Sequence, residues 1–186
     1  CFGIGGLLIG LVVTPWLWLC VRDPAKRQQH AQQVIRRCFF CFVQLMSKLG
    51  VLTYHIEGVE RLQRSTQELV IANHPTLIDV VLLIAFMQNA NCVVKQALWR
   101  NPFTRGPVQA ARYVLNDNSE RCIAECVVRL QEPGAASLVV FPEGTRTEQG
   151  QQLNEFQRGA ANIALRAGVP IRPVLITCTP STLTKN

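Results

Sequence analysis

The chain has 186 residues, which is enough for one domain with a sizeable core and too few for two ordinary domains. Its formal net charge of +7 excludes a preference for cationic partners and favours an anionic one, either a membrane surface or a nucleic acid. The eight cysteines suit a reducing compartment, and their spacing matches no zinc site, so we predict no structural metal.

The first 21 residues have no ionisable side chain other than cysteine. As a helix they would be roughly 30 Å long, the thickness of one hydrocarbon core, so we predict a spanning or inserted helix. Basic residues follow this run, and the positive-inside tendency then predicts that the rest of the chain lies on the cytoplasmic side of an inner or cytoplasmic type of membrane. Residues 31–50 read as a second helix with Gly50 as its C-cap. We therefore predict a membrane-associated helical hairpin over residues 1–50; a core helix of a soluble fold is the alternative for the second helix.

From Val51 onward, short strand-like runs alternate with helical patterns. Ser119 is a plausible N-cap and Gly168 a plausible C-cap. We predict an α/β domain over residues 51–186, truncated at its C-terminus, with a mostly buried mixed sheet flanked by helices. The predicted strands are 51–57, 69–73, 91–95, 113–116, 137–141 and 171–177, and the predicted helices are 76–88, 119–131 and 157–167.

The stretch ANHPTLIDVV, residues 72–81, places two ionisable side chains where a strand runs into a helix. If His74 precedes the helix and Pro75 opens it, Asp79 lies one turn later and can point back at the imidazole. A carboxylate on one ring nitrogen leaves the other free to take a proton, which makes a general base. The structural alternative is that His74 caps the helix and Asp79 lies on its exposed face. No GxSxG motif supplies a nucleophile, so such a base would most simply activate a hydroxyl group of a substrate.

A second candidate site follows the buried strand that ends at Phe141. The turn FPEGTR, residues 141–146, brings Thr145 and Arg146 to the end of that strand, where backbone N–H groups and a guanidinium can bind a phosphate. An ordinary strand-to-loop turn with a surface arginine is the structural alternative. We predict that the base and the anion-binding turn belong to one site.

With NHPTLID, FPEGTR and VPIRPV (169–174) in this order, residues 51–178 resemble the phospholipid and glycerol acyltransferase family, also called the PlsC-like or 1-acylglycerol-3-phosphate acyltransferase family. The resemblance implies transfer of a fatty acyl group from acyl-CoA or acyl carrier protein to the hydroxyl of a lysophosphatidate-like acceptor in phospholipid synthesis. On that basis His74 is the base and Asp79 orients it. The same resemblance assigns acceptor phosphate binding to Glu143, Gly144, Thr145 and Arg146, and the acyl pocket to Pro170 and Pro173, for which a plain strand is an equal alternative.

The chain departs from the family pattern in two places. In RYVLNDN, Asp117 agrees with the pattern, but Arg112 occupies a glycine position and Asn118 an arginine position. In FQRG, Gln157 replaces a frequent lysine, and Arg158 follows one residue later. We expect Arg105 or Arg112 to compensate for the missing arginine, and Arg158 to keep the charge of the missing lysine in a shifted position, so that Arg112 and Arg158 are predicted substrate-binding cations. The alternatives are the same chemistry on another amphipathic acceptor, such as an amino-acid lipid, another lysophospholipid or a specialised lipid, or a catalytically silent membrane-binding module.

The resemblance implies no cofactor beyond the carrier of the acyl donor, because histidine can activate the hydroxyl and arginine can neutralise the phosphate. The expected partners are membrane lipids, the acyl donor and the acceptor. We do not expect nucleic-acid binding, because no strand alternates aromatic and basic residues as a stacking platform would require.

Overall fold

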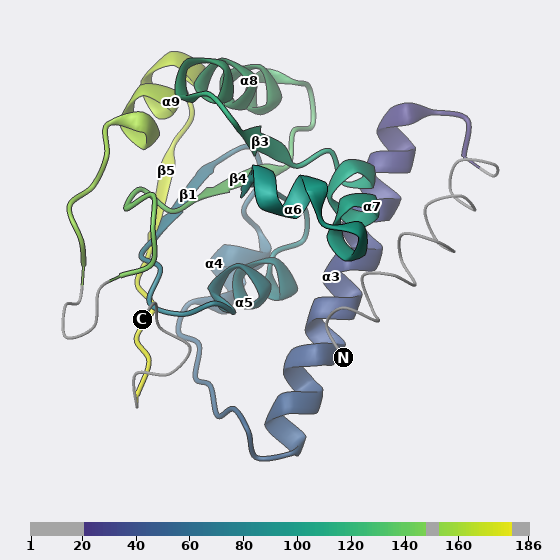
Figure 1. Cartoon of the computed structure of the whole chain (residues 1–186), viewed down its shortest axis with the longest axis vertical. Coiled ribbons are helices and arrows are strands. Elements are labelled where there is room, and N and C mark those ends of the chain that lie inside the picture. The colour runs from purple at the N-terminus through teal and green to yellow at the C-terminus, as the bar shows by residue number, and fades with distance from the viewer. Residues whose placement is uncertain (1–20, 148–152, 180–186) are drawn as a thin grey trace.

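The computed structural model describes residues 21–147 and 153–179, which form three layers with one sheet between two sets of helices (Figure 1). The elements in chain order are α3 (Pro24–Lys48), α4 (Val59–Gln63), β1 (Leu69–Ala72), α5 (Asp79–Phe86), β2 (Ala90–Lys95), α6 (Gln96–Arg100), α7 (Pro102–Ala110), β3 (Val114–Asn116), α8 (Ser119–Gln131), β4 (Ser137–Val140), α9 (Gly159–Ala167) and β5 (Ile171–Val174).

The sheet has the strand order β3-β2-β4-β1-β5, and all of its four pairings are parallel. The prediction of an α/β fold with a buried sheet flanked by helices is confirmed, whereas the prediction of a mixed sheet is wrong. Each of the strands β1 to β4 is followed by one or two helices that lead to the next strand, and no tight hairpin joins two neighbours among the described residues, so the strands keep one direction. Residues 51–57, predicted as a strand, form an irregular segment outside the sheet.

Alternating strand residues face the two helical layers. Val70, Cys92 and Val139 pack in one cluster with residues of α3, α5 and α7. Leu69 and Leu138 point the other way and pack with residues of α8 and α9. Because both faces of the sheet are covered, its strands read as continuous apolar runs rather than as alternating ones.

Helix α3 belongs to the first of these layers. It begins at Pro24 behind the N-cap Asp23, seven residues earlier than predicted, and packs against α5 and α7. Ile35 and Val43 are buried in the packed clusters, and the side chain of Gln32 donates to the side chain of Asn91 at 2.8 Å. The predicted helical hairpin is therefore not supported as a separate membrane element: its first helix lies outside the described residues, and its second helix packs on the domain. Within the described ranges, no helix is long and apolar enough to cross a membrane.

Helices α6 and α7 were not predicted, although the sequence has a start signal for α7. The side chain of Asn101 accepts a hydrogen bond from the backbone of Phe103, and Pro102 occupies the first turn, where its missing N–H costs nothing. Helix α8 starts as predicted at Ser119, but its N-cap is Asn118, which accepts from the backbone of Arg121. The predicted C-cap Gly168 is confirmed, with a positive φ of 67°.

Candidate active site

The parallel sheet brings the two predicted motifs to one edge. Strands β1 and β4 are neighbours, and they end at Ala72 and Val140. The segments that follow them, 73–79 and 141–147, therefore leave the same carboxyl edge of the sheet side by side. In parallel α/β sheets this edge is where ligands bind.

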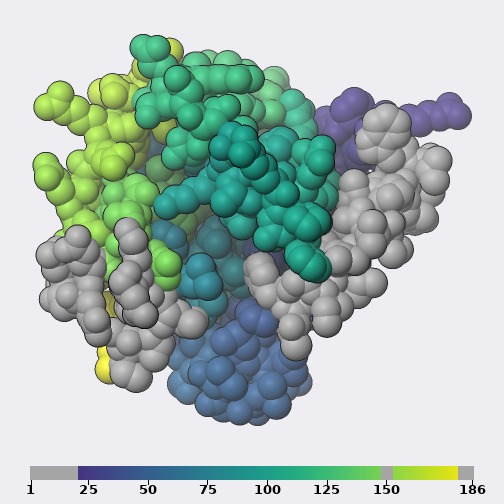
Figure 2. Space-filling model, viewed as in Figure 1, coloured from purple at the N-terminus to yellow at the C-terminus, as the bar shows by residue number. Residues whose placement is uncertain are grey.

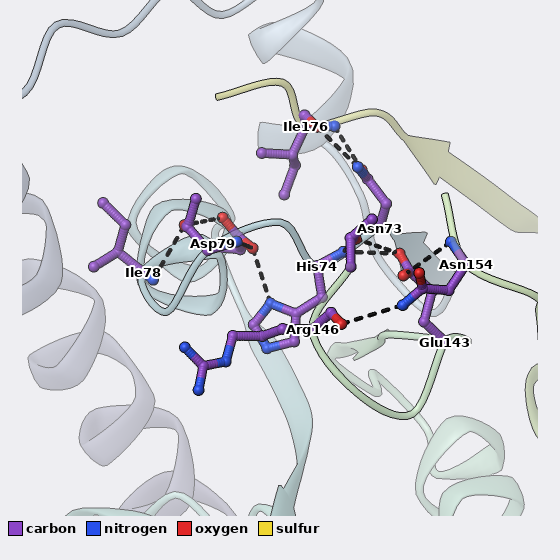
Figure 3. A network of polar contacts seen from close by, with 10 residues as sticks. Asn73, His74, Ile78, Asp79, Glu143, Arg146, Asn154 and Ile176 are labelled. Atoms are coloured by element: carbon purple, nitrogen blue, oxygen red, sulfur yellow. Dashed lines mark hydrogen bonds and ion pairs between the residues drawn. The ribbon is translucent and has the colours of Figure 1, made fainter. Parts of the chain in front are cut away.

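The histidine and the aspartate of the first motif are in contact. His74 Nδ1 lies 2.8 Å from Asp79 Oδ2 (Figure 3). The Asp79 side chain is fully buried, whereas the His74 side chain is 21% exposed. No described residue engages the second ring nitrogen, Nε2. The pair thus has a buried carboxylate behind the ring and an accessible nitrogen in front of it, the arrangement that a general base requires.

Local structure explains why the chain tolerates a buried carboxylate here. Helix α5 starts at Asp79 rather than at residue 76, and residues 75–78 form a turn instead of its first helical turn. Both the backbone N–H of Thr76, at 2.7 Å, and the Thr76 hydroxyl donate to the carboxylate. The N-terminus of α5 adds a favourable dipole. With these donors and the imidazole, the Asp79 charge is compensated on all sides and its orientation is fixed.

Phe141 contacts the face of the imidazole, whereas Asp79 contacts its Nδ1 edge. Its ring stacks on the His74 ring with the centroids 4.2 Å apart and the planes inclined by 22°. Aromatic stacking of this kind limits ring rotation and favours a cationic imidazole over its face. Phe141 is the first residue after β4, so the strand pairing of β1 and β4 sets this contact.

Glu143, predicted to bind substrate, has its carboxylate engaged by the protein itself. It is buried, and its Oε1 accepts from the His74 backbone N–H at 3.1 Å and from the Thr147 hydroxyl at 2.9 Å. Its Oε2 accepts from the backbone of Asn154 at 3.1 Å. A carboxylate has only acceptors and repels a phosphate, so these contacts place Glu143 as a clamp. It ties the FPEGTR turn to the backbone of His74, and the Thr147 N–H donates to the His74 carbonyl at 2.7 Å.

The other three predicted residues of the turn are more exposed than Glu143. Gly144 has a φ of 68°, and its N–H donates to the carbonyl of Phe141 at 3.0 Å. A Cβ at this position would lie 2.6 Å from Nε2 of Gln157, so the absence of a side chain lets the Gln157 carboxamide pack on the turn. Thr145 and Arg146 are half-buried, and in Figure 3 the Arg146 side chain extends along the imidazole. The structure thus brings Gly144, Thr145 and Arg146 to His74.

Of the remaining predicted residues, two lie at the opposite edge of the sheet and two lie near this one. Arg112 precedes β3 and so lies at the opposite, amino edge of the sheet, where its guanidinium donates to Gln28 of α3. Pro170 also precedes its strand, and its carbonyl accepts from Leu69 at the start of β1. Pro173 pairs with Ile71 in the exposed edge strand β5, where a proline is tolerated. Arg158, the exposed N-cap of α9, follows Gln157 and lies close to the turn.

Sequence reasoning missed the residues that hold the site together. Thr76 and Asp79 have the spacing of a capping box, in which a carboxylate reaches back to a backbone N–H three residues earlier, and that signal was readable. Asn73 also supports the site, because its side-chain amide donates to the Ile176 carbonyl at 2.8 Å and accepts from the Ile176 N–H at 2.7 Å. No local sequence pattern identifies Thr147 and Asn154 as site residues, because Thr147 binds His74 and Asn154 binds Glu143, which are not neighbours in the sequence.

A family model described as Acyltransferase matches residues 53–177. A chloroplastic 1-acyl-sn-glycerol-3-phosphate acyltransferase of Brassica napus is 29% identical over 76% of this chain and 43% of its own length. A putative 1-acyl-sn-glycerol-3-phosphate acyltransferase of Caenorhabditis elegans is 35% identical over 66% of this chain and 45% of its own length. The chain thus spans less than half the length of these two relatives.

Among solved structures, the crystal structure of the 1-acyl-sn-glycerophosphate acyltransferase PlsC from Thermotoga maritima has the same fold. Its TM-score is 0.65 at 22% identity, and the match covers 92% of this chain and 71% of the other. The family match includes His74, Asp79 and the FPEGTR turn, and it covers more than half of the chain. The chain belongs to the acyltransferase family.

Proposed function

We propose that the protein is an O-acyltransferase that moves a fatty acyl group from the thioester of acyl-CoA or acyl carrier protein to the free hydroxyl of a 1-acylglycerol-3-phosphate-like acceptor. The observation that carries the proposal is the contact between His74 and the fully buried Asp79. The names of the relatives support the acceptor class, because they are 1-acyl-sn-glycerol-3-phosphate acyltransferases.

In the proposed step, His74 Nε2 takes the proton of the acceptor hydroxyl while the hydroxyl oxygen attacks the thioester carbonyl carbon. The new ester C–O bond forms, the C–S bond breaks, and the departing thiolate takes the proton back from the imidazolium. Asp79 stabilises the imidazolium between these two transfers and does not itself accept the proton. The reaction needs no covalent intermediate on the protein.

Arg146 is the proposed partner of the acceptor phosphate. A guanidinium forms paired, charge-assisted hydrogen bonds with phosphate oxygens, and the neighbouring turn can add the backbone N–H groups around Gly144 and Thr145. Glu143 holds this turn on the backbone of His74. A phosphate bound at Arg146 would therefore be placed at a fixed distance from the base, which converts headgroup binding into orientation of the reacting hydroxyl.

Membrane association is part of the same proposal. The acceptor and the acyl product are amphipathic, so they reside in a bilayer, and the apolar run of residues 1–21 favours attachment to it. Phe40, Leu45 and Leu49 of the α3 end are exposed to solvent and would be covered by lipid.

Thioester consumption by the full chain in lipid vesicles tests the proposal, with lysophosphatidate and a panel of other lyso-lipids as acceptors. Replacing His74→Ala should lower the rate by about 100-fold or more. The matched control is His55→Ala, because this histidine is 85% exposed and outside the motifs. Equal rates for the two variants would refute the base, and a rate that depends on His74 only with another lyso-lipid would change the acceptor.

A further inference from the structure

Acidic residues are absent from two long segments of the chain. Residues 24–56 and 80–116 contain none of the 12 Asp and Glu but nine of the 19 Lys and Arg. The first segment contains α3, and the second contains α6, α7 and the part of α5 that follows its first residue, Asp79; α3 packs against both α5 and α7. The positive charge is therefore concentrated in one part of the fold, where no carboxylate of these segments offsets it.

Within this part, the helices α6 and α7 carry exposed apolar and basic side chains together. Leu98 is 40% exposed and Phe103 is 44% exposed. The cations beside them in the sequence are exposed as well. We define the α6–α7 surface as Lys95, Leu98, Arg100, Phe103 and Arg105. Neither Leu98 nor Phe103 belongs to the hydrophobic clusters of the domain, so the described packing does not use these two side chains.

The α6–α7 surface lies at the same edge of the sheet as the catalytic pair. Lys95 is the last residue of β2, so α6 starts at the carboxyl edge, where His74 follows β1. One strand, β4, separates β2 from β1. The carboxyl ends of β2 and β1 are therefore two strand spacings apart, roughly 10 Å. Figure 2 shows the teal spheres of α6 and α7 projecting beside a hollow, with the blue end of α3 below it on the same face.

We propose that the α6–α7 surface docks on the headgroup region of a bilayer that contains anionic lipid, as a contact additional to α3. The cations bind lipid phosphates, each contributing about 1 kcal/mol near an anionic surface, while Leu98 and Phe103 insert between headgroups. This inference rests on the proposed function, because an acceptor drawn from the bilayer must reach His74 at the same edge of the sheet.

The positive charge suits both an anionic bilayer and an acidic protein such as an acyl carrier protein, and continuity with the apolar end of α3 favours the bilayer. The exposed apolar side chains of the α3 end, Phe40, Leu45 and Leu49, belong to the same acid-free part of the chain. A protein partner of ordinary size would not require apolar exposure on two separate elements, whereas a lipid surface contacts every element that reaches it.

Hydrogen–deuterium exchange of the full chain tests the contact locally, so attachment through any other segment does not hide the result. The probes are vesicles of phosphatidylcholine alone and of phosphatidylcholine with phosphatidylglycerol. We expect amide exchange in residues 96–110 to slow several-fold on the anionic vesicles only, and this protection to weaken with added salt. The variant Arg100→Gln/Arg105→Gln should lose it, because removing two such cations weakens the contact by roughly 30-fold.

The matched control is Arg121→Gln/Arg166→Gln, which removes two exposed cations from α8 and α9 in the other helical layer and should leave the protection unchanged. A second pair compares Leu98→Ser/Phe103→Ser with Val128→Ser/Leu165→Ser, since Val128 and Leu165 are 59% and 82% exposed.

Three results would overturn the proposal: unchanged exchange in 96–110 on anionic vesicles, equal protection in the Arg100→Gln/Arg105→Gln variant, or protection by acyl carrier protein but not by vesicles. His74→Ala should keep the protection, so failure of the proposed catalytic activity is recognised separately.

Discussion

Asp79→Asn isolates the charge of the proposed catalytic pair, His74 and Asp79, from its geometry. The carboxylate has three hydrogen-bond contacts, with the His74 ring, the Thr76 N–H and the Thr76 hydroxyl. An asparagine oxygen can accept from the ring and from the backbone, and its amide can donate to the hydroxyl oxygen, because a hydroxyl both donates and accepts. The substitution therefore keeps the shape and the contacts and removes only the negative charge.

The expected effect on the rate follows from the distance of the charges. With 2.8 Å between Nδ1 and Oδ2, the centres of an imidazolium and a carboxylate lie about 4 Å apart. At an effective dielectric constant of about 20, two such charges attract each other by roughly 4 kcal/mol. This attraction exists only while the imidazolium exists, so its loss raises the barrier and should lower kcat by about 1,000-fold.

The assay is thioester consumption at saturating acceptor, with the melting temperature of each variant measured in parallel. Glu132→Gln is the control, because this carboxylate lies between the end of α8 and the start of β4, at the opposite, amino edge of the sheet. We expect Asp79→Asn to fold, with a melting temperature close to the wild-type value, and to lose activity. A folded Asp79→Asn protein with a rate within about threefold of wild type would show that the buried charge does not serve the reaction.

Three further outcomes are expected. Phe141→Leu should lower kcat by up to about tenfold with little change in KM, because stacked rings contribute roughly 0.5–1.5 kcal/mol and this ring orients the base. Asn118→Arg should lower the free energy of unfolding in urea by about 1 kcal/mol, because it removes the N-cap of α8, whereas Asn118→Asp should keep it. The Arg172 guanidinium holds the pKa of Glu68 below its ordinary value. The stability it contributes is therefore present at neutral pH and lost as the pH falls through that lowered pKa, so Glu68→Gln and wild type should differ in urea unfolding at pH 7 and converge once the pH is below that lowered pKa.

Sequence reasoning worked best where the interacting residues are close in the chain. The spacing of His74 and Asp79 predicted a contact between them, and the structure contains that contact. Helix α8 and the C-cap Gly168 followed from apolar periodicity and from the conformational freedom of glycine. The short helices α6 and α7 were missed because five to nine residues give too few turns for a periodic pattern.

The family motifs did not reveal which contacts their individual residues make. Glu143 lies within a motif that suggests phosphate binding, yet its carboxylate binds the backbone of His74, 69 positions earlier in the chain. Arg112 seemed able to replace a missing cation, but a residue before a parallel strand lies at the opposite edge from one that follows a strand. Such assignments depend on the direction and order of the strands, which local patterns do not contain.

The sequence by itself determined the α/β class, the contact between His74 and Asp79 and the position of the FPEGTR turn after its strand, because each depends on residues within a few positions of one another. Only the tertiary structure decided that the sheet is entirely parallel, that α3 packs on α5, and that Phe141 and Glu143 hold the histidine. An apolar helix face looks the same in sequence whether lipid or protein covers it, and the register of β1 against β4 is set by packing on both faces of the sheet.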